Sequence, residues 1–158
     1  MSENINWITA ILELAITFSG VFLAFTFDRI IDRRKENHAK KDLLRNLCFE
    51  LNELKSKLTG AAYRLYPDIW DSAIASGQLS LLSSEQITKL TKVYSLVKGT
   101  DYEAIRVRDA EEAFKSNNHP TTMKYLRENW EGLSLAHFKR MEATRTAIDN
   151  ILKEKLWD

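Results

Sequence analysis

"ELAITFSGVFLAFTFDRIIDRRKE" (residues 13–36) begins with a carboxylate, continues for fourteen residues without a charge, and then becomes densely charged. The apolar part starts before this stretch, because the 21 residues from Trp7 to Phe27 hold one charged side chain, that of Glu13. A helix of that length spans ~31 Å at about 1.5 Å per residue, close to the thickness of the hydrocarbon core of a bilayer. The stretch therefore predicts a membrane-spanning helix.

A cleaved signal peptide and a core helix of a soluble protein are the two alternatives to a retained transmembrane helix. A secretory signal has a basic N-terminal region, a shorter apolar core and a small-residue cleavage site. The first six residues, MSENIN, hold no Lys or Arg, and the apolar run continues directly into FTFDRIIDRR. We therefore favour the retained helix over both alternatives.

Basic residues gather on one side of the apolar run and predict its orientation. The amino-terminal side carries only Glu3 and the terminus, whereas six basic residues follow the run: Arg29, Arg33, Arg34, Lys35, Lys40 and Lys41. The positive-inside rule places that side in the cytoplasm. We expect a single-pass protein of the inner (plasma) membrane, with its N-terminus outside and its C-terminal part cytoplasmic.

One face of the predicted helix is small and polar. Its members recur at spacings of three and four residues, the repeat of a helical face: Thr9, Glu13, Thr17, Gly20, Ala24 and Asp28. We call these six residues the small-polar face. The remaining positions are mostly large and apolar, and the Gly20–Ala24 pair lets a neighbouring backbone approach closely.

Two interpretations of this face remain open. In the first, Glu13 lies near the outer interface and reaches water. In the second, the helix associates with copies of itself and turns the face inward, because a carboxylate in lipid costs roughly 2.5–3.5 kcal/mol at the bilayer centre. This sequence holds no second apolar run of that length, so we expect any partner helix to come from another chain. Whether such a centre conducts ions is a separate question.

The residues that follow predict a long helix with an apolar face. Between Asp28 and Gly60 there is no Gly or Pro, and five leucines recur at alternating spacings of three and four: Leu44, Leu47, Leu51, Leu54 and Leu58. Such a face suits a short coiled coil or the core of a helical domain, and we favour the core. The stretch from Asp32 to Asp42 lacks an apolar face and is typical of a solvated stalk.

Turn and capping signals divide the rest of the chain into helices. Pro67 suits a helix start and Gly77 its stop. Ser83 and Gln86 form a capping-box pattern that opens a helix expected to end at Gly99.

We expect a further helix from Thr100 or Asp101 to the NNHP stretch, and then helix from Pro120 to the end. Gly132 leaves open whether that last part is one helix or two. The predicted fold is all-α, with a transmembrane helix (1–28), a juxtamembrane stalk helix (29–58) and a small cytoplasmic helical bundle (59–158).

Composition excludes several classes of function. The net charge of +1 over 158 residues gives no overall attraction to nucleic acid. One cysteine, Cys48, allows neither an internal disulfide nor a cysteine-based zinc site. The three histidines have no ligand spacing. We expect no cofactor, no metal and no enzyme activity.

Two of the three histidines, His38 and His137, are considered for a chemical role. Arg33 and His38 have the R-x(4)-H spacing of the RNase motif in HEPN-type helical domains, but two residue types at a fixed spacing recur by chance. A solvated charged face is the plainer interpretation. His137 follows the apolar face of the last helix near Trp130, and we interpret it as a core or interface histidine with its hydrogen bonds satisfied.

A family resemblance rests on two patterns in the chain. Glu13, Gly20, Leu23, Ala24 and Asp28 form E-x(6)-G-x-x-L-A-x(3)-D, followed by basic residues. A later stretch forms W-x(5)-S-G-x-L-x-x-L, with Trp70, Ser76, Gly77, Leu79 and Leu82. Together they resemble a group of small uncharacterised single-pass bacterial membrane proteins.

The resemblance covers about residues 10–97 of this chain. Many members of that group have Trp just after the acidic position, where this chain has Ile30 and Ile31. The resemblance implies a membrane helix with a helical domain and no particular activity.

Three hypotheses of function follow. The first is a homo-oligomer in the bilayer, assembled through the small-polar face, that forms a pore or perturbs the membrane; this suits a stress or antiphage defence effector by analogy alone. The second is a membrane-tethered binding or scaffold module that recruits a cytoplasmic protein. The third is the HEPN-like RNase.

Overall fold

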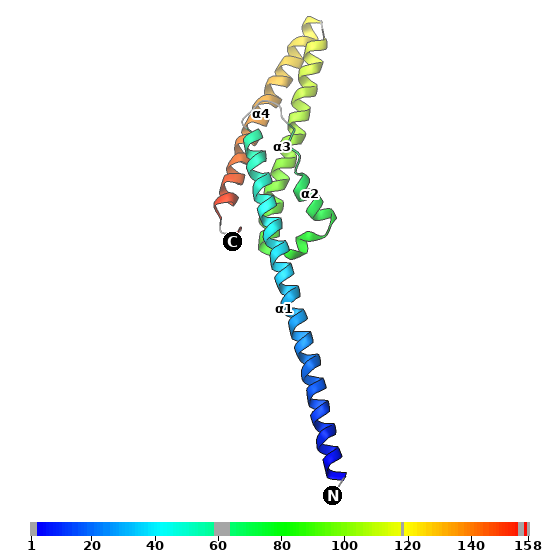
Figure 1. Cartoon of the computed structure of the whole chain (residues 1–158). Coiled ribbons are helices and arrows are strands. Elements are labelled where there is room, and N and C mark those ends of the chain that lie inside the picture. Colours follow the sequence, from blue (N-terminus) through cyan, green and yellow to red (C-terminus); the bar gives the residue numbers. More distant parts are fainter. Residues whose placement is uncertain (1–2, 59–63, 118, 155–156, 158) are drawn as a thin grey trace. The chain divides into compact units, whose positions relative to one another are not determined.

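The computed structural model describes residues 3–58, 64–117, 119–154 and 157, and over these residues the chain is helical with no strand. The order is α1 (Glu3–Lys57), α2 (Asp68–Ala75), a short 3-10 helix η1 (Gln78–Leu81), α3 (Ser84–Ser116) and α4 (Pro120–Lys153). Figure 1 shows these elements along the chain. The all-α prediction is confirmed for the described residues.

The chain forms two compact units, residues 1–40 and residues 41–158. The first consists of the greater part of α1, and its described side chains from Thr9 to Ala39 are exposed. The boundary falls inside the predicted stalk, 29–58, so that Lys41 to Leu58 belong to the second unit. α1 is long and apolar enough near its N-terminus to cross a membrane, with a mean hydropathy of 2.0 over its most apolar 18-residue window.

The end of α1 supplies the centre of the core of the second unit. The five leucines at three-and-four spacing are all buried: Leu44, Leu47, Leu51, Leu54 and Leu58. They share one apolar cluster with residues of α2, α3 and α4, including Trp70, Leu90, Val97 and Ile148. The prediction that this leucine face is a core face is therefore confirmed. Truncation of a leucine as buried as Leu47 to alanine costs about 2–5 kcal/mol.

α2 and η1 lie between two of the predicted turn signals. Pro67 occupies the position just before α2, where its fixed φ suits a helix start. Gly77 has φ of +72°, a left-handed conformation that a side chain disfavours, and it separates α2 from η1. The pattern predicted both boundaries.

α3 begins where the capping box predicted and ends much later. The Ser83 hydroxyl accepts from the Gln86 N–H at 3.2 Å, and the Gln86 side chain accepts from the Ser83 N–H at 3.0 Å. The predicted stop at Gly99 and the predicted new start at Thr100 or Asp101 are wrong, because α3 is continuous to Ser116.

Tertiary contacts explain this continuity. Thr100 is buried, and its hydroxyl bonds to the Leu96 carbonyl at 2.9 Å and to the Thr144 hydroxyl of α4 at 2.8 Å. The Arg140 guanidinium of α4 lies 3.4 Å from the position a Gly99 Cβ would take. A helical glycine costs only about 1 kcal/mol relative to alanine, which these contacts offset.

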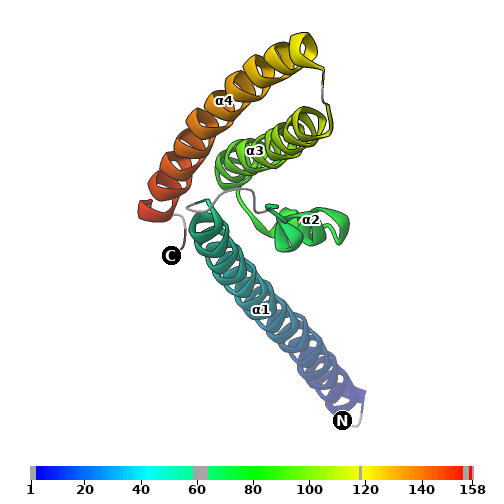
Figure 2. The same cartoon turned by 90° about the horizontal axis from the view of Figure 1, so that it is seen from above.

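α3 and α4 form a helical hairpin. Figures 1 and 2 show the two helices running in opposite directions, with the end of α3 near the start of α4. α4 passes through Gly132 without a break, so Gly132 does not divide it. Near the open end of the hairpin, Ile148 and Ile151 of α4 join the core cluster.

Candidate functional site

The small-polar face lies on α1 in the first unit, and all six of its residues are exposed there. A Cβ added at Gly20 would meet no atom within 4 Å. Nothing else in the described chain covers this face. Its exposure therefore leaves room for a close helix–helix contact with another chain.

Most hydroxyl groups of the apolar segment have partners inside the helix. The hydroxyls of Thr17, Ser19 and Thr26 donate to carbonyls four residues earlier at 2.7–2.8 Å. Such bonds satisfy a donor without solvent, which suits an apolar environment. The Glu13 carboxylate has no hydrogen bond or ion pair with the described residues, and it is the polar group of this segment that most needs water or a partner.

The six basic residues after the apolar run are distributed along the two units rather than gathered in a site. Arg29, Arg33 and Arg34 are exposed, and Lys35 lies 3.9 Å from Asp32, a spacing typical of weak surface pairs. Lys40 closes the first unit and Lys41 opens the second. These residues form a mixed-charge segment in which acids alternate with bases.

Arg33 and His38, the residues of the RNase hypothesis, are both exposed on α1. Within the part of the chain that the structure describes, they form no cavity and contact no third catalytic group. The hypothesis stays a prediction and gains no support from this geometry.

A buried carboxylate joins three elements of the second unit. Glu50 of α1 is only 5% exposed. It accepts hydrogen bonds from the Ile69 N–H at 2.6 Å, the Trp70 N–H at 3.2 Å and the Tyr94 hydroxyl at 2.7 Å. Because the first N–H groups of a helix lack partners within the helix, Glu50 acts as the cap that α2 lacks locally.

An aromatic pair lies beside this carboxylate, because Tyr94 donates a hydrogen bond to Glu50 and stacks on Trp70. The rings of Trp70 and Tyr94 stack with centroids 4.6 Å apart and planes 6° from parallel. Burial raises the pKa of Glu50 above its ordinary value, although the hydrogen bonds from Tyr94 and from the two backbone N–H groups act in the opposite direction. Burial, with the Glu50 carboxylate beside it, likewise raises the pKa of Tyr94. The cluster is a structural junction without access for a substrate.

Glu50 is a buried residue that was not predicted, although its position in the sequence carries a signal. Glu50 lies three residues after Leu47 and four before Leu54, so it falls on the buried side of the leucine pattern. A charged residue at such a position predicts a buried, paired carboxylate.

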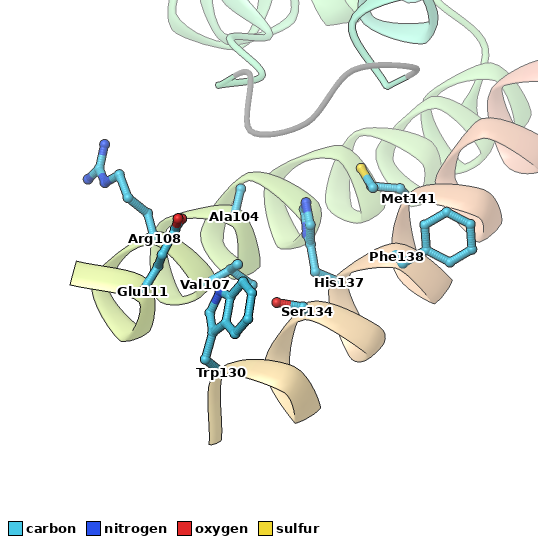
Figure 3. Close-up of a pocket in the computed structure, with 9 residues that line it drawn as sticks. All are labelled: Ala104, Val107, Arg108, Glu111, Trp130, Ser134, His137, Phe138 and Met141. Carbon is cyan, nitrogen blue, oxygen red and sulfur yellow. The ribbon is translucent and has the colours of Figure 1, made fainter. Parts of the chain in front are cut away.

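A cavity of about 300 Å³ lies between α3 and α4. α3 contributes Ala104, Val107, Arg108 and Glu111, and α4 contributes Trp130, Ser134, His137, Phe138 and Met141. Figure 3 shows Trp130 and His137 extending from α4 toward α3. We call this space the α3–α4 cavity. Its volume is at the lower end of the range for small-molecule sites, about 300–1,000 Å³.

Unpartnered polar atoms concentrate beside this cavity. Among the described side chains, three buried polar atoms have no hydrogen-bond partner: Trp130 Nε1, His137 Nδ1 and Glu103 Oε2. The first two belong to cavity residues. Glu103 is a neighbour of His137 on α3, and its other carboxylate oxygen bonds to Arg140.

His137 therefore differs from its sequence interpretation. It is buried in the hairpin, with 9% of its surface exposed, but its Nδ1 is unsatisfied. Burial lowers the pKa of the imidazole, and the nearby Glu103 carboxylate opposes that shift. The lowered pKa favours the neutral imidazole, in which one ring nitrogen accepts and the other donates.

Comparisons with protein-family models, with curated proteins and with solved structures give no match. The family resemblance therefore stays a prediction from two sequence patterns.

Proposed function

We propose that this chain is a single-pass membrane protein that self-assembles through the small-polar face of α1. The observation that carries the proposal is the Glu13 carboxylate, which lies in an apolar helix long enough to span a bilayer and has no partner within the described chain. Packing the faces of several copies together removes this carboxylate from lipid.

The small residues of the same face support close assembly. Gly20 and Ala24 are four residues apart, so they lie one above the other on the helix. Without large side chains there, two backbones approach closely enough for van der Waals contact, which drives helix association in lipid. The basic residues after Asp28 support a cytoplasmic location of the second unit, by the positive-inside rule.

An oligomer built in this way has Glu13 and Asp28 near the two ends of its central face and Thr17 between them. Such a centre supports either a pore or a membrane perturbation controlled by the cytoplasmic unit. The tie to stress or antiphage defence is architectural analogy, and the proposal does not depend on it.

Substitution on the two sides of α1 tests the assembly. Gly20→Leu inserts a bulky side chain into the proposed contact, and we expect it to convert a discrete oligomer into a monomer in mild detergent. Phe22→Leu changes a large apolar residue away from the small-polar face and should leave the oligomer intact. The mass of the protein–detergent complex, corrected for bound detergent, provides the measurement.

The proposal fails if the wild-type protein is a monomer under these conditions. It fails equally if Gly20→Leu leaves the mass of the complex unchanged.

A further inference from the structure

We propose that the surface of α1 around Phe49 is a contact between two copies of this chain, whose α1 helices pair in parallel there. This inference rests on the proposed self-assembly of α1 and adds to it a contact made by the second unit. It begins from Phe49, an aromatic side chain that is 67% exposed. Phe49 lies two residues from both Leu47 and Leu51, so it is on the side of α1 that faces away from the leucine core.

A groove of about 610 Å³ lies beside Phe49. Trp157 forms one wall, and its indole Nε1 donates to the Ile151 carbonyl at 3.0 Å, which holds the ring in place. The rest of the lining comes from α1: Lys41, Leu44, Arg45, Cys48, Phe49 and Asn52. The last four of these have the spacing i, i+3, i+4 and i+7, which is the hole that accepts one side chain of a facing helix in a coiled coil. The first four repeat the same spacing, so the groove suits a second helix.

The spacing along α1 indicates that this second helix is the α1 of another copy. Steps of three and four residues lead from Asp28, the last residue of the small-polar face, to Phe49. The residues on the way are all exposed: Ile31, Lys35, His38, Asp42 and Arg45. α1 is one continuous helix over this range, and alternating steps of three and four form the seam of a parallel coiled coil. A pairing that begins at the small-polar face therefore continues along the seam to Phe49.

The polar residues of this seam suit a parallel pair. Asp42 and Arg45 of one chain are 3.9 Å apart, so they form a weak ion pair without a hydrogen bond. Because they lie one helical turn apart, each can pair with its opposite charge on the second copy. Asn52 is the next residue of the seam, and an asparagine at such a position fixes register and orientation. Its side-chain N–H donates to the Cys48 carbonyl at 2.8 Å, and its carboxamide oxygen remains able to accept.

Cysteine crosslinking of the full chain in native membranes tests this contact. In a Cys48→Ser background, Asn52→Cys reports on the groove and Thr17→Cys reports on the small-polar face. Lys139→Cys, at an exposed position of α4, is the control for random collision. After oxidation we expect a high yield of disulfide-linked dimer at positions 52 and 17 and a low yield at position 139.

Substitution of Phe49 tests whether its side chain makes the contact. Phe49→Asp places like charges opposite each other, so it should lower the dimer yield at position 52 severalfold while position 17 keeps its yield. Phe49→Leu keeps an apolar side chain and should keep the yield at position 52. Tyr125→Asp introduces the same charge at another aromatic residue of the second unit, which is 69% exposed, and serves as the matched control.

The outcomes separate this contact from the assembly of the small-polar face. A yield at position 52 no higher than at position 139, with a high yield at position 17, overturns the contact alone, and another molecule then covers Phe49. A high yield at position 52 with a low yield at position 17 supports the contact and contradicts assembly through the small-polar face. Low yields at both positions overturn both proposals, and equal effects of Phe49→Asp and Tyr125→Asp overturn the role of Phe49.

Discussion

Glu50 holds the start of α2 against α1 and α3 through three hydrogen bonds. These bonds favour the ionised carboxylate, but burial outweighs them, so the pKa of Glu50 is raised. The folded protein therefore binds the Glu50 proton more tightly than the unfolded chain does. The stability that this proton contributes is fully present below the ordinary pKa of 4.5 and is lost as the pH rises through the folded pKa.

The raised pKa of Glu50 gives a prediction for the variant Glu50→Gln, whose side chain cannot ionise. As the pH rises from about 4.5 toward neutrality, the free energy of unfolding of the wild-type protein should fall relative to that of Glu50→Gln. The loss amounts to about 1.4 kcal/mol for each unit by which the folded pKa exceeds the unfolded one. Urea unfolding in mild detergent, followed by circular dichroism across this pH range, provides the measurement.

Glu53→Gln is the matched control, because Glu53 is an exposed carboxylate one turn along the same helix. It removes a carboxylate that pairs with Lys57 on the helix surface and leaves the buried junction intact, so its unfolding curves provide the baseline for Glu50→Gln. Parallel pH profiles for the wild-type protein and Glu50→Gln would contradict the assigned role of burial.

Individual residues show that the sequence predicts which helix face is buried but does not predict which side chains meet there. The leucine spacing identified the core face of α1, because burial on a helix follows a simple period. It did not identify the partners of Glu50, since Ile69, Trp70 and Tyr94 come from two other elements. The sequence also did not predict that Nδ1 of His137 lacks a hydrogen-bond partner, because hydrogen-bond satisfaction depends on tertiary geometry.

At the scale of the elements, two glycines in different conformations should respond oppositely to the same substitution. Gly132 lies inside α4 with open space around it, so Gly132→Ala should raise the free energy of unfolding by about 0.5–1 kcal/mol. Gly77 has φ of +72°, so Gly77→Ala should lower it by roughly 1 kcal/mol. Urea unfolding at one fixed pH measures both, and changes of the same sign would contradict the two conformations.

The helix boundaries illustrate what local signals specify. The capping box at Ser83 and the left-handed turn at Gly77 were predictable, because their determinants lie within a few residues. The continuity of α3 through Gly99 was not, because Gly99 is kept helical by contacts with α4 that include the Thr100–Thr144 hydrogen bond. The end of α3 at Ser116 does fall at the predicted NNHP stretch. A residue that disfavours helix, such as glycine, stays helical when tertiary packing stabilises that conformation by more than about 1 kcal/mol.

At the scale of the whole molecule, the two units differ in how their apolar surface is covered. The second unit buries its apolar residues in a core shared by four helices. The first unit leaves large apolar side chains such as Phe18, Phe22 and Phe25 exposed by 69–75%. In the proposed single-pass arrangement a bilayer would cover such surface, and the small-polar face would be the part of α1 that lipid covers least well.

Cysteine crosslinking along α1 tests the proposed assembly most directly. In a Cys48→Ser background, single cysteines at positions 13, 17, 20 and 24 and at positions 18, 22 and 25 are oxidised in native membranes, and the yield of disulfide-linked dimer is measured. Assembly through the small-polar face predicts high yields at the first four positions and low yields at the other three. Uniform yields, or higher yields at 18, 22 and 25, would contradict it.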